Sequence, residues 1–117
     1  MRGQRKVADK DRLLHIKESI DFILSQTETI TEDDFYRNEL LKKATVRDLE
    51  IIGEAANYIS EELKNKTPEI PWRQIIGTRH RIIHEYFHVS YVMVWEIVKN
   101  DLPILSQQIN KILEEQL

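Results

Sequence analysis

The segment His84–His88 reads HEYFH and therefore has the pattern H-E-x-x-H. On a helix this pattern presents two histidines as zinc ligands and the glutamate as a general base. A catalytic zinc also needs a third protein ligand and an open coordination position. No histidine follows His88, which leaves Glu96, Glu114 and Glu115 as candidates. Because so short a motif arises easily by chance, we expect neither a metal nor another cofactor here.

A second set of chemically useful side chains lies in the same segment. The region from Pro71 to Phe87 predicts one helix, since proline suits the first helical turn. At about 100° per residue, Arg79 falls within the apolar stripe of this helix. That stripe consists of Trp72, Ile75, Ile76, Ile82, Ile83 and Tyr86. The predicted polar strip, about 100° to 140° away, contains Arg73, His80 and His84.

An arginine within an apolar stripe requires an explanation, because a buried charge without a partner is costly. One explanation is an ion pair with Glu54. The other is that the stripe faces a second subunit or a ligand cleft, where the guanidinium binds an anion. With His84 and Tyr86, Arg79 would then form a patch of a cation, an imidazole and a phenol. A cation and a group that titrates near neutrality suit metal-free phosphodiester cleavage.

Composition predicts the elements that position these residues. The 117 residues fit a single domain, 1–117, with residues 1–8 as a loose N-terminal arm. Three glycines, three prolines and apolar spacings of three and four indicate an all-α fold, an antiparallel bundle of about four to five main helices. The expected helices are Ala8–Gln26, Thr31–Asn38 with a Thr31 capping box, Glu39–Asn65, Pro71–Phe87, and a segment capped by Ser90 that kinks or restarts at Pro103 and ends near Glu115. Gly53 within a helix suggests a close helix–helix approach.

Charge and hydropathy narrow the cellular setting. The chain has 17 basic and 20 acidic residues, but residues 70–83 contain three arginines and no acid. No segment approaches the roughly 20 apolar residues of a membrane span. There is no cysteine, which suits the cytoplasm, where disulfides are rare. Together these two features predict a cytoplasmic protein that does not contact a membrane.

The stretch RHRIIHEY, Arg79 to Tyr86, fits R-x4-H-x-Y and resembles the signature of HEPN-domain proteins of the HepT type. Four further segments resemble that family in the same order: DRLLHIKESIDFI, RDLEIIGEAANYIS, PEIPWRQIIGTR and VWEIVKNDLP. The resemblance covers nearly the whole chain. Such proteins are ribonuclease toxins of type VII-like toxin–antitoxin pairs, each with an MntA-type nucleotidyltransferase as antitoxin.

The resemblance implies a homodimer with a composite site between two motif helices and RNA as the substrate. It implies that Arg79 and His84 are the catalytic pair for metal-independent cleavage by the 2′-hydroxyl. His80 stands where the family most often has asparagine, which leaves its supporting role open. Tyr86 corresponds to the position that the antitoxin adenylylates in related proteins, and the resemblance gives it a supporting role in positioning RNA. The alternative is a catalytically inactive HEPN subunit that binds nucleotides or nucleic acid beside a nucleotidyltransferase.

Two further arginines lie within the predicted helix Pro71–Phe87. Arg73 and Arg81 could contact the RNA backbone, or they could be solvated charges on the outer face of the helix.

Overall fold

The computed structural model describes residues 2–84 and 88–115, with side chains from Ala8 onward. Its elements, in chain order, are α1 (Arg2–Thr27), α2 (Glu32–Arg37), α3 (Glu39–Asn57), α4 (Glu61–Lys66), α5 (Trp72–Ile76), α6 (Thr78–Ile82), β1 (Ile83–His84), β2 (His88–Val89), α7 (Tyr91–Glu96), the π-helical turn η2 (Ile97–Asp101) and α8 (Leu102–Glu115). The predicted all-α bundle is confirmed, and a two-residue strand pair is its one β feature among the described residues. The first helix begins at Arg2 instead of Ala8.

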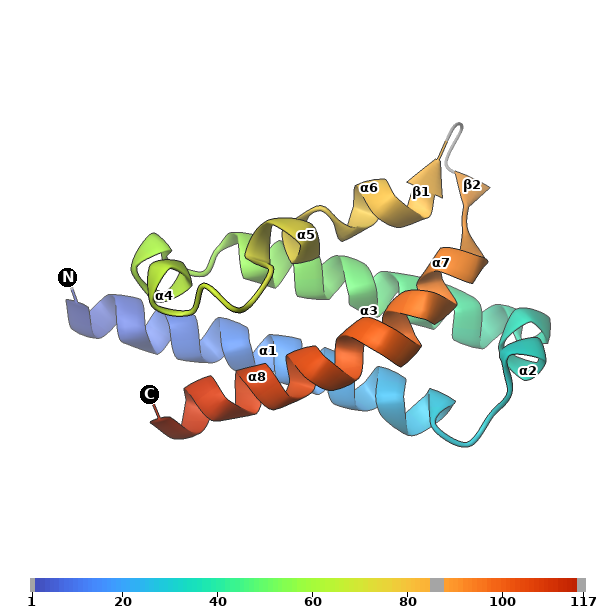
Figure 1. Cartoon of the computed structure of the whole chain (residues 1–117), viewed down its shortest axis with the longest axis horizontal. Helices are drawn as coiled ribbons and strands as arrows, with labels where there is room; N and C mark the ends of the chain where they lie inside the picture. Colours follow the sequence, from blue (N-terminus) through green and yellow to red (C-terminus); the bar gives the residue numbers. More distant parts are fainter. Residues whose placement is uncertain (1, 85–87, 116–117) are drawn as a thin grey trace.

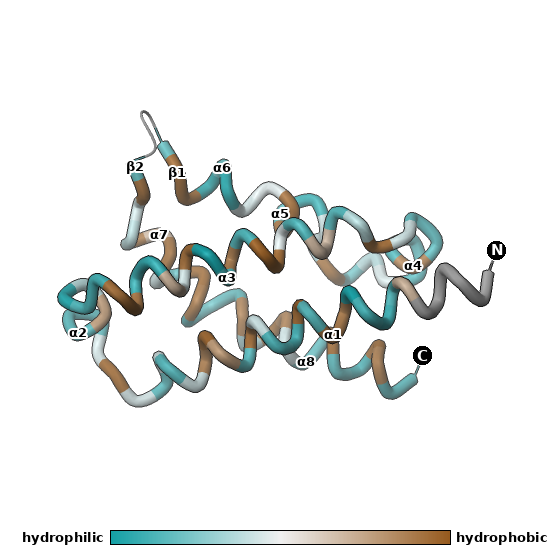
Figure 2. Tube along the Cα trace, turned by 180° about the vertical axis from the view of Figure 1, so that it is seen from behind, coloured by the Kyte–Doolittle hydropathy of each residue, from teal (hydrophilic) through white to brown (hydrophobic). Residues whose placement is uncertain are grey.

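Three long helices form the body of the molecule. Helix α1 packs against α3 and α8, and α3 runs antiparallel to α1 (Figure 1). Helices α5 and α6 lie across α3, and the β1–β2 pair stands off one end of the bundle. Hydrophobic and hydrophilic residues alternate in short runs along these helices (Figure 2). The buried core includes Leu13, Ile16, Ile20, Ile23, Leu49, Ile52, Ile82, Val98 and Ile109. No helix in the described part is long and apolar enough to cross a bilayer.

Two predicted helix starts are confirmed by their capping hydrogen bonds. The Asp34 amide donates to Thr31 Oγ1, and the Thr31 amide donates to Asp34 Oδ2, each at 3.1 Å. These bonds hold the pKa of the Asp34 carboxyl below its ordinary value. At the start of α7, the Met93 amide donates to Ser90 Oγ at 3.3 Å. Both caps satisfy amide groups that lack partners within their own helix.

The prediction of one helix from Glu39 to Asn65 is wrong, because α3 ends at Asn57 and α4 begins at Glu61. The intervening turn is held by a contact from α1. Asp9, which is buried, accepts hydrogen bonds from the Ser60 amide at 2.9 Å and from Ser60 Oγ at 2.6 Å. Ser60 also caps α4. Asp9 and Ser60 are 51 positions apart, so no short segment of the sequence indicates that they are in contact.

The close approach suggested by Gly53 is present between α3 and α5. A Cβ atom at this position would lie 3.1 Å from the carbonyl oxygen of Ile75 and 3.5 Å from that of Ile76. Glycine therefore lets the α5 backbone pack directly on α3, which fixes the position of the motif segment that follows.

The disturbance predicted at Pro103 takes the form of a π-helical turn. The Leu102 amide donates to the carbonyl of Ile97, five residues earlier. Proline has no amide hydrogen, and within an α-helix its ring clashes with the carbonyl four residues before it, here that of Lys99. The wider turn accommodates the proline, so one continuous but bent helix runs from α7 through η2 into α8.

Candidate functional site

The motif segment is not one helix, so the prediction of a helix from Pro71 to Phe87 is wrong. It divides at Gly77 into α5 and α6, and α6 ends at Ile82. Ile83 already has extended backbone angles, φ −104° and ψ 119°. Consecutive β-branched side chains at Ile82 and Ile83 favour this change, because they lose rotamer freedom in a helix and fit a strand.

Arg79 lies on the outside of α6. The buried residues of this helix are Thr78 and Ile82, and the Arg79 side chain is exposed. Its predicted position in an apolar stripe is therefore wrong, because the break at Gly77 changes the helical phase between α5 and α6. The alternative ion pair is not formed either: Glu54 is exposed, and no carboxylate of the described residues pairs with Arg79. The guanidinium is thus presented to solvent.

His84 lies in a hairpin instead of a helix. Strands β1 and β2 are antiparallel, with Ile83 opposite Val89 and His84 opposite His88. At the base of the hairpin the Ser90 amide donates to the Ile82 carbonyl at 2.7 Å. Ile83 and Val89 pack against the core, whereas His84 and His88 are exposed. This alternation follows the two-residue period of a strand and directs both imidazoles outward.

The H-E-x-x-H pattern consequently does not have its helical zinc geometry. His84 and His88 are cross-strand partners, with Cα atoms expected to be about 4.5–5.5 Å apart. Within residues 2–84 and 88–115, no three histidine, aspartate or glutamate side chains gather as a metal would require.

The other predicted site residues have different surroundings. His80 on α6 and Arg73 on α5 are exposed. Arg81 is half-buried, and its Nη1 donates to Asp101 Oδ2 at 3.3 Å. This bond ties α6 to the end of η2, so the view of Arg81 as a fully solvated charge is wrong. Tyr86 lies outside the described residues.

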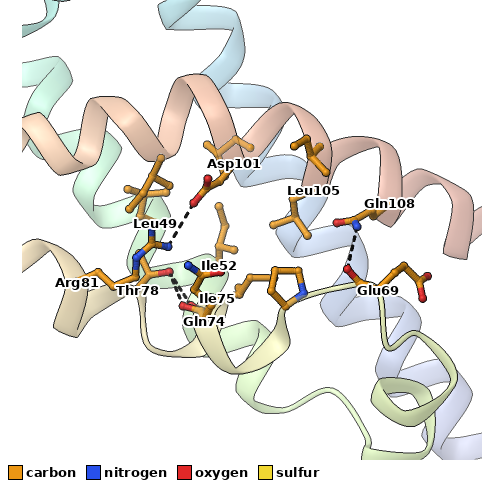
Figure 3. A pocket seen from close by; sticks show the side chains of 14 residues that line it. Leu49, Ile52, Glu69, Gln74, Ile75, Thr78, Arg81, Asp101, Leu105 and Gln108 are labelled. Carbon is orange, nitrogen blue, oxygen red and sulfur yellow. Dashed lines mark hydrogen bonds and ion pairs between the residues drawn. The ribbon is translucent and has the colours of Figure 1, made fainter.

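A pocket beside Arg81 was not predicted. It has a volume of about 270 Å³ and lies between α5–α6 and α8 (Figure 3). The ion pair of Arg81 and Asp101 lies at one end, and Gln108 with Glu69 at the other. Its walls come from segments far apart in the chain, and only the bundle packing brings them together. No local spacing in the sequence could have revealed it.

The exposed end of α6 and the outward side of β1 together offer a defined chemistry. Arg79 supplies a permanent positive charge, and His84 supplies an imidazole, which can act as an acid or a base. Arg79 lies in the last turn of α6, and only Ile83 separates this helix from His84. A guanidinium and an imidazole are the kinds of group that anion binding and proton transfer require.

Comparison with known proteins is consistent with this chemistry. The family described as HepT-like, Ribonuclease HepT-like, matches residues 16–112. A protein of Caldanaerobacter subterraneus named "Putative RNase" is 38% identical over 104 residues, covering 89% of this chain and 93% of that protein. The "Probable ribonuclease HepT" of Thermococcus cleftensis is 39% identical over 107 residues, covering 92% of this chain and 97% of that protein.

A "Putative RNase" of Methanocaldococcus jannaschii is 37% identical over 97 residues, covering 83% of this chain and 89% of that protein. No solved structure matches the chain significantly. The family match over most of the chain, together with these relatives, shows that the protein belongs to the HepT-like ribonuclease family.

Proposed function

We propose that this protein is a metal-independent RNA endonuclease that cleaves RNA with Arg79 and His84. The observation that carries the proposal is the exposure of both side chains on either side of the α6–β1 junction. A guanidinium without a described carboxylate partner is available to a phosphate. The family membership and the ribonuclease names of the relatives support RNA as the substrate.

The reaction follows from the two side chains. The 2′-oxygen of one nucleotide attacks the adjacent phosphorus, and the bond from phosphorus to the 5′-oxygen of the next nucleotide breaks. The products are a 2′,3′-cyclic phosphate and a free 5′-hydroxyl. His84 moves one proton and water the other: either His84 takes the proton of the 2′-hydroxyl while water protonates the departing 5′-oxygen, or His84 protonates that oxygen while water takes the 2′-proton. Arg79 stabilises the extra negative charge on the five-coordinate phosphorus.

A homodimer is part of the proposal, with the two catalytic segments facing a shared cleft. Exposed apolar side chains at the hairpin end of the bundle support it. Leu40 is 81% exposed and Val92 is 57% exposed. Lys42 lies 4.5 Å from the Tyr91 ring centroid, which places the start of α3 beside the start of α7. Both apolar side chains therefore extend from the region next to the strand pair, where a second copy could cover them.

Cleavage of a labelled single-stranded RNA by purified protein in EDTA tests the activity. Arg79→Ala and His84→Ala should each lower the rate by about a hundredfold or more, because electrostatic stabilisation and general acid–base catalysis each contribute at that level. His88→Ala is the matched control, since it removes an exposed imidazole from the facing strand of the same hairpin. Full activity of either catalytic variant would reject the site, and loss of wild-type activity in EDTA would reject the metal-free mechanism.

We also propose that a nucleotidyltransferase antitoxin silences the enzyme by adenylylating Tyr86. The added phosphates would bring negative charge and bulk to the segment that carries Arg79 and His84, and would oppose the binding of RNA phosphates. The test is mass spectrometry after co-expression with a candidate antitoxin. Trypsin releases residues 82–99 as one peptide that also contains Tyr91. Fragmentation and a Tyr86→Phe variant are therefore needed to assign the adenylate, and an adenylate that persists in this variant would refute the assignment.

A further inference from the structure

The pocket between α5–α6 and α8 has the properties of a site for a flat ring. Its volume of about 270 Å³ is just below the roughly 300–1,000 Å³ of ligand pockets, so it would hold one ring system and little more. Ile52 and Ile75 line one wall, and Leu105 lines the wall formed by α8 (Figure 3). Aliphatic surfaces on two sides exclude water from the faces of a bound ring.

The polar groups of the pocket lie where the edges of such a ring would be. Arg81 and Asp101 offer a donor beside an acceptor at one end. Gln108, whose Nε2 donates to the Glu69 carbonyl at 3.3 Å, lies at the other end. Gln74 adds a second amide to the lining. Amides, carboxylates and guanidinium are the groups that read the edges of nucleobases.

Charge favours a neutral ring over a phosphate in this pocket. Arg81 is its one cation, and the Asp101 carboxylate already pairs with it at 3.3 Å. An added phosphate would have to displace Asp101 or lie beside its negative charge. A nucleobase carries no net charge and can donate to Asp101 while it accepts from the guanidinium and the amides.

The exposed side of α6 connects this pocket to the catalytic pair. Thr78 and Ile82 are the buried residues of α6. The next side chains, Arg79, His80 and Arg81, point in directions about 100° apart around the helix axis. His80 therefore occupies the outermost position between the Arg79 side and the pocket side. An RNA strand crossing α6 would meet Arg79, then His80, then the mouth of the pocket.

We propose that this pocket binds one unstacked nucleobase of the RNA next to the scissile linkage. The choice of RNA as the source of the base rests on the proposed function. In this arrangement Arg79 holds the reacting phosphate, His80 lies along the backbone that crosses α6, and the aliphatic slot with its polar ends selects the base. The pocket thus contributes to sequence preference, whereas the catalytic pair acts on any linkage.

Methyl NMR spectra of the whole protein test base binding without any cleavage. Each of the four nucleoside 5′-monophosphates is titrated separately, and inorganic phosphate is the reference probe. At least one nucleotide should shift the methyl signals of Ile52, Ile75 and Leu105 saturably, while Leu13 in the α1 core stays unchanged. The proposal fails if none of the four nucleotides shifts the pocket methyls, or if phosphate alone shifts them equally.

Two neighbouring glutamines on α8 give a matched pair of variants. Gln108→Ala should weaken nucleotide binding by about threefold to tenfold, the effect of one lost hydrogen bond, and should raise KM for RNA with little change in kcat. Gln107 is exposed and does not line the pocket, so Gln107→Ala should bind as the wild type does. Equal weakening by both variants would overturn the proposal.

The catalytic variants separate this inference from the proposed function. Arg79→Ala and His84→Ala should abolish cleavage and leave the nucleotide-induced methyl shifts intact. If the wild type shifts its pocket methyls but cuts no RNA, the nuclease proposal fails and the pocket assignment stands. If it cuts RNA without any such shift, the pocket assignment fails and the nuclease stands.

Discussion

The bond between the Ser90 amide and the Ile82 carbonyl closes the base of the hairpin that carries His84. Ser90→Pro removes this amide hydrogen with little distortion of the backbone. The φ angle of Ser90 is −85°, near the range of proline, and the preceding residue is in a strand, as proline requires. We expect the hairpin to loosen and His84 to lose its fixed position.

The magnitude can be worked out by comparison with Ser90→Ala. Both variants lose the Oγ cap of α7, which costs about 1 kcal/mol. The proline variant also loses one backbone hydrogen bond, worth a net 0.5–1.5 kcal/mol or so. Proline also reduces the conformational entropy of the unfolded chain, which raises the free energy of unfolding by roughly 0.4–1 kcal/mol. The two variants should therefore have free energies of unfolding within about 1 kcal/mol of each other.

The two variants should differ in their rates of RNA cleavage although they unfold with similar free energies. A catalytic group displaced by about 1 Å can lower the rate by about a hundredfold, so Ser90→Pro should cleave RNA at least about tenfold more slowly than Ser90→Ala. Urea unfolding and initial rates on the same RNA provide the comparison. Equal cleavage rates in the two variants would show that this hydrogen bond does not position His84.

Two further predictions concern the helices that support the site. Gly53→Val should lower the free energy of unfolding by about 1–3 kcal/mol in urea titrations, because its side chain meets the Ile75 carbonyl; an unchanged midpoint would contradict the close packing of α3 and α5. Burial raises the pKa of Asp48, so its folded form binds a proton more tightly than the unfolded chain does. The Asp48 carboxyl therefore stabilises the folded state most at pH values below the ordinary aspartate pKa. This stabilisation is lost as the pH rises through the raised pKa of the folded state. Asp48→Asn should therefore be at least as stable as the wild type at pH 7, with the difference shrinking near pH 3–4; a variant that melts lower at pH 7 would refute this.

Local sequence signals predicted the parts of the fold that depend on neighbouring residues. The Thr31 capping box and the Ser90 cap need only a hydroxyl at the start of an amphipathic segment, and both form as expected. Gly53 indicated a close approach because glycine is costly within a helix unless space demands it. The all-α class followed from the apolar spacing together with the small number of glycines and prolines.

The sequence named the residues of the candidate site, but the helix on which it placed them is wrong. The segment from Pro71 onward has helical spacing, yet the cross-strand packing of Ile83 and Val89 competes with helix formation beyond Ile82. A helical wheel drawn through Gly77 therefore placed Arg79 within the apolar stripe, whereas its side chain is exposed and the stripe is interrupted. The pairing of Arg81 with Asp101 depends on contacts across the bundle, which no single window of sequence contains.

The ion pair between Arg81 and Asp101 also determines how strongly added salt should weaken binding to RNA. Each phosphate neutralised on a single strand releases counterions and contributes about −0.7 to the slope of log K against log salt concentration. Three free arginines on α5 and α6 would give a slope of about −2.1 per subunit, whereas Arg73 and Arg79 alone give about −1.4. Because one of its three guanidinium groups is already neutralised by a carboxylate, this surface should retain RNA over a wider range of ionic strength than its arginine content implies.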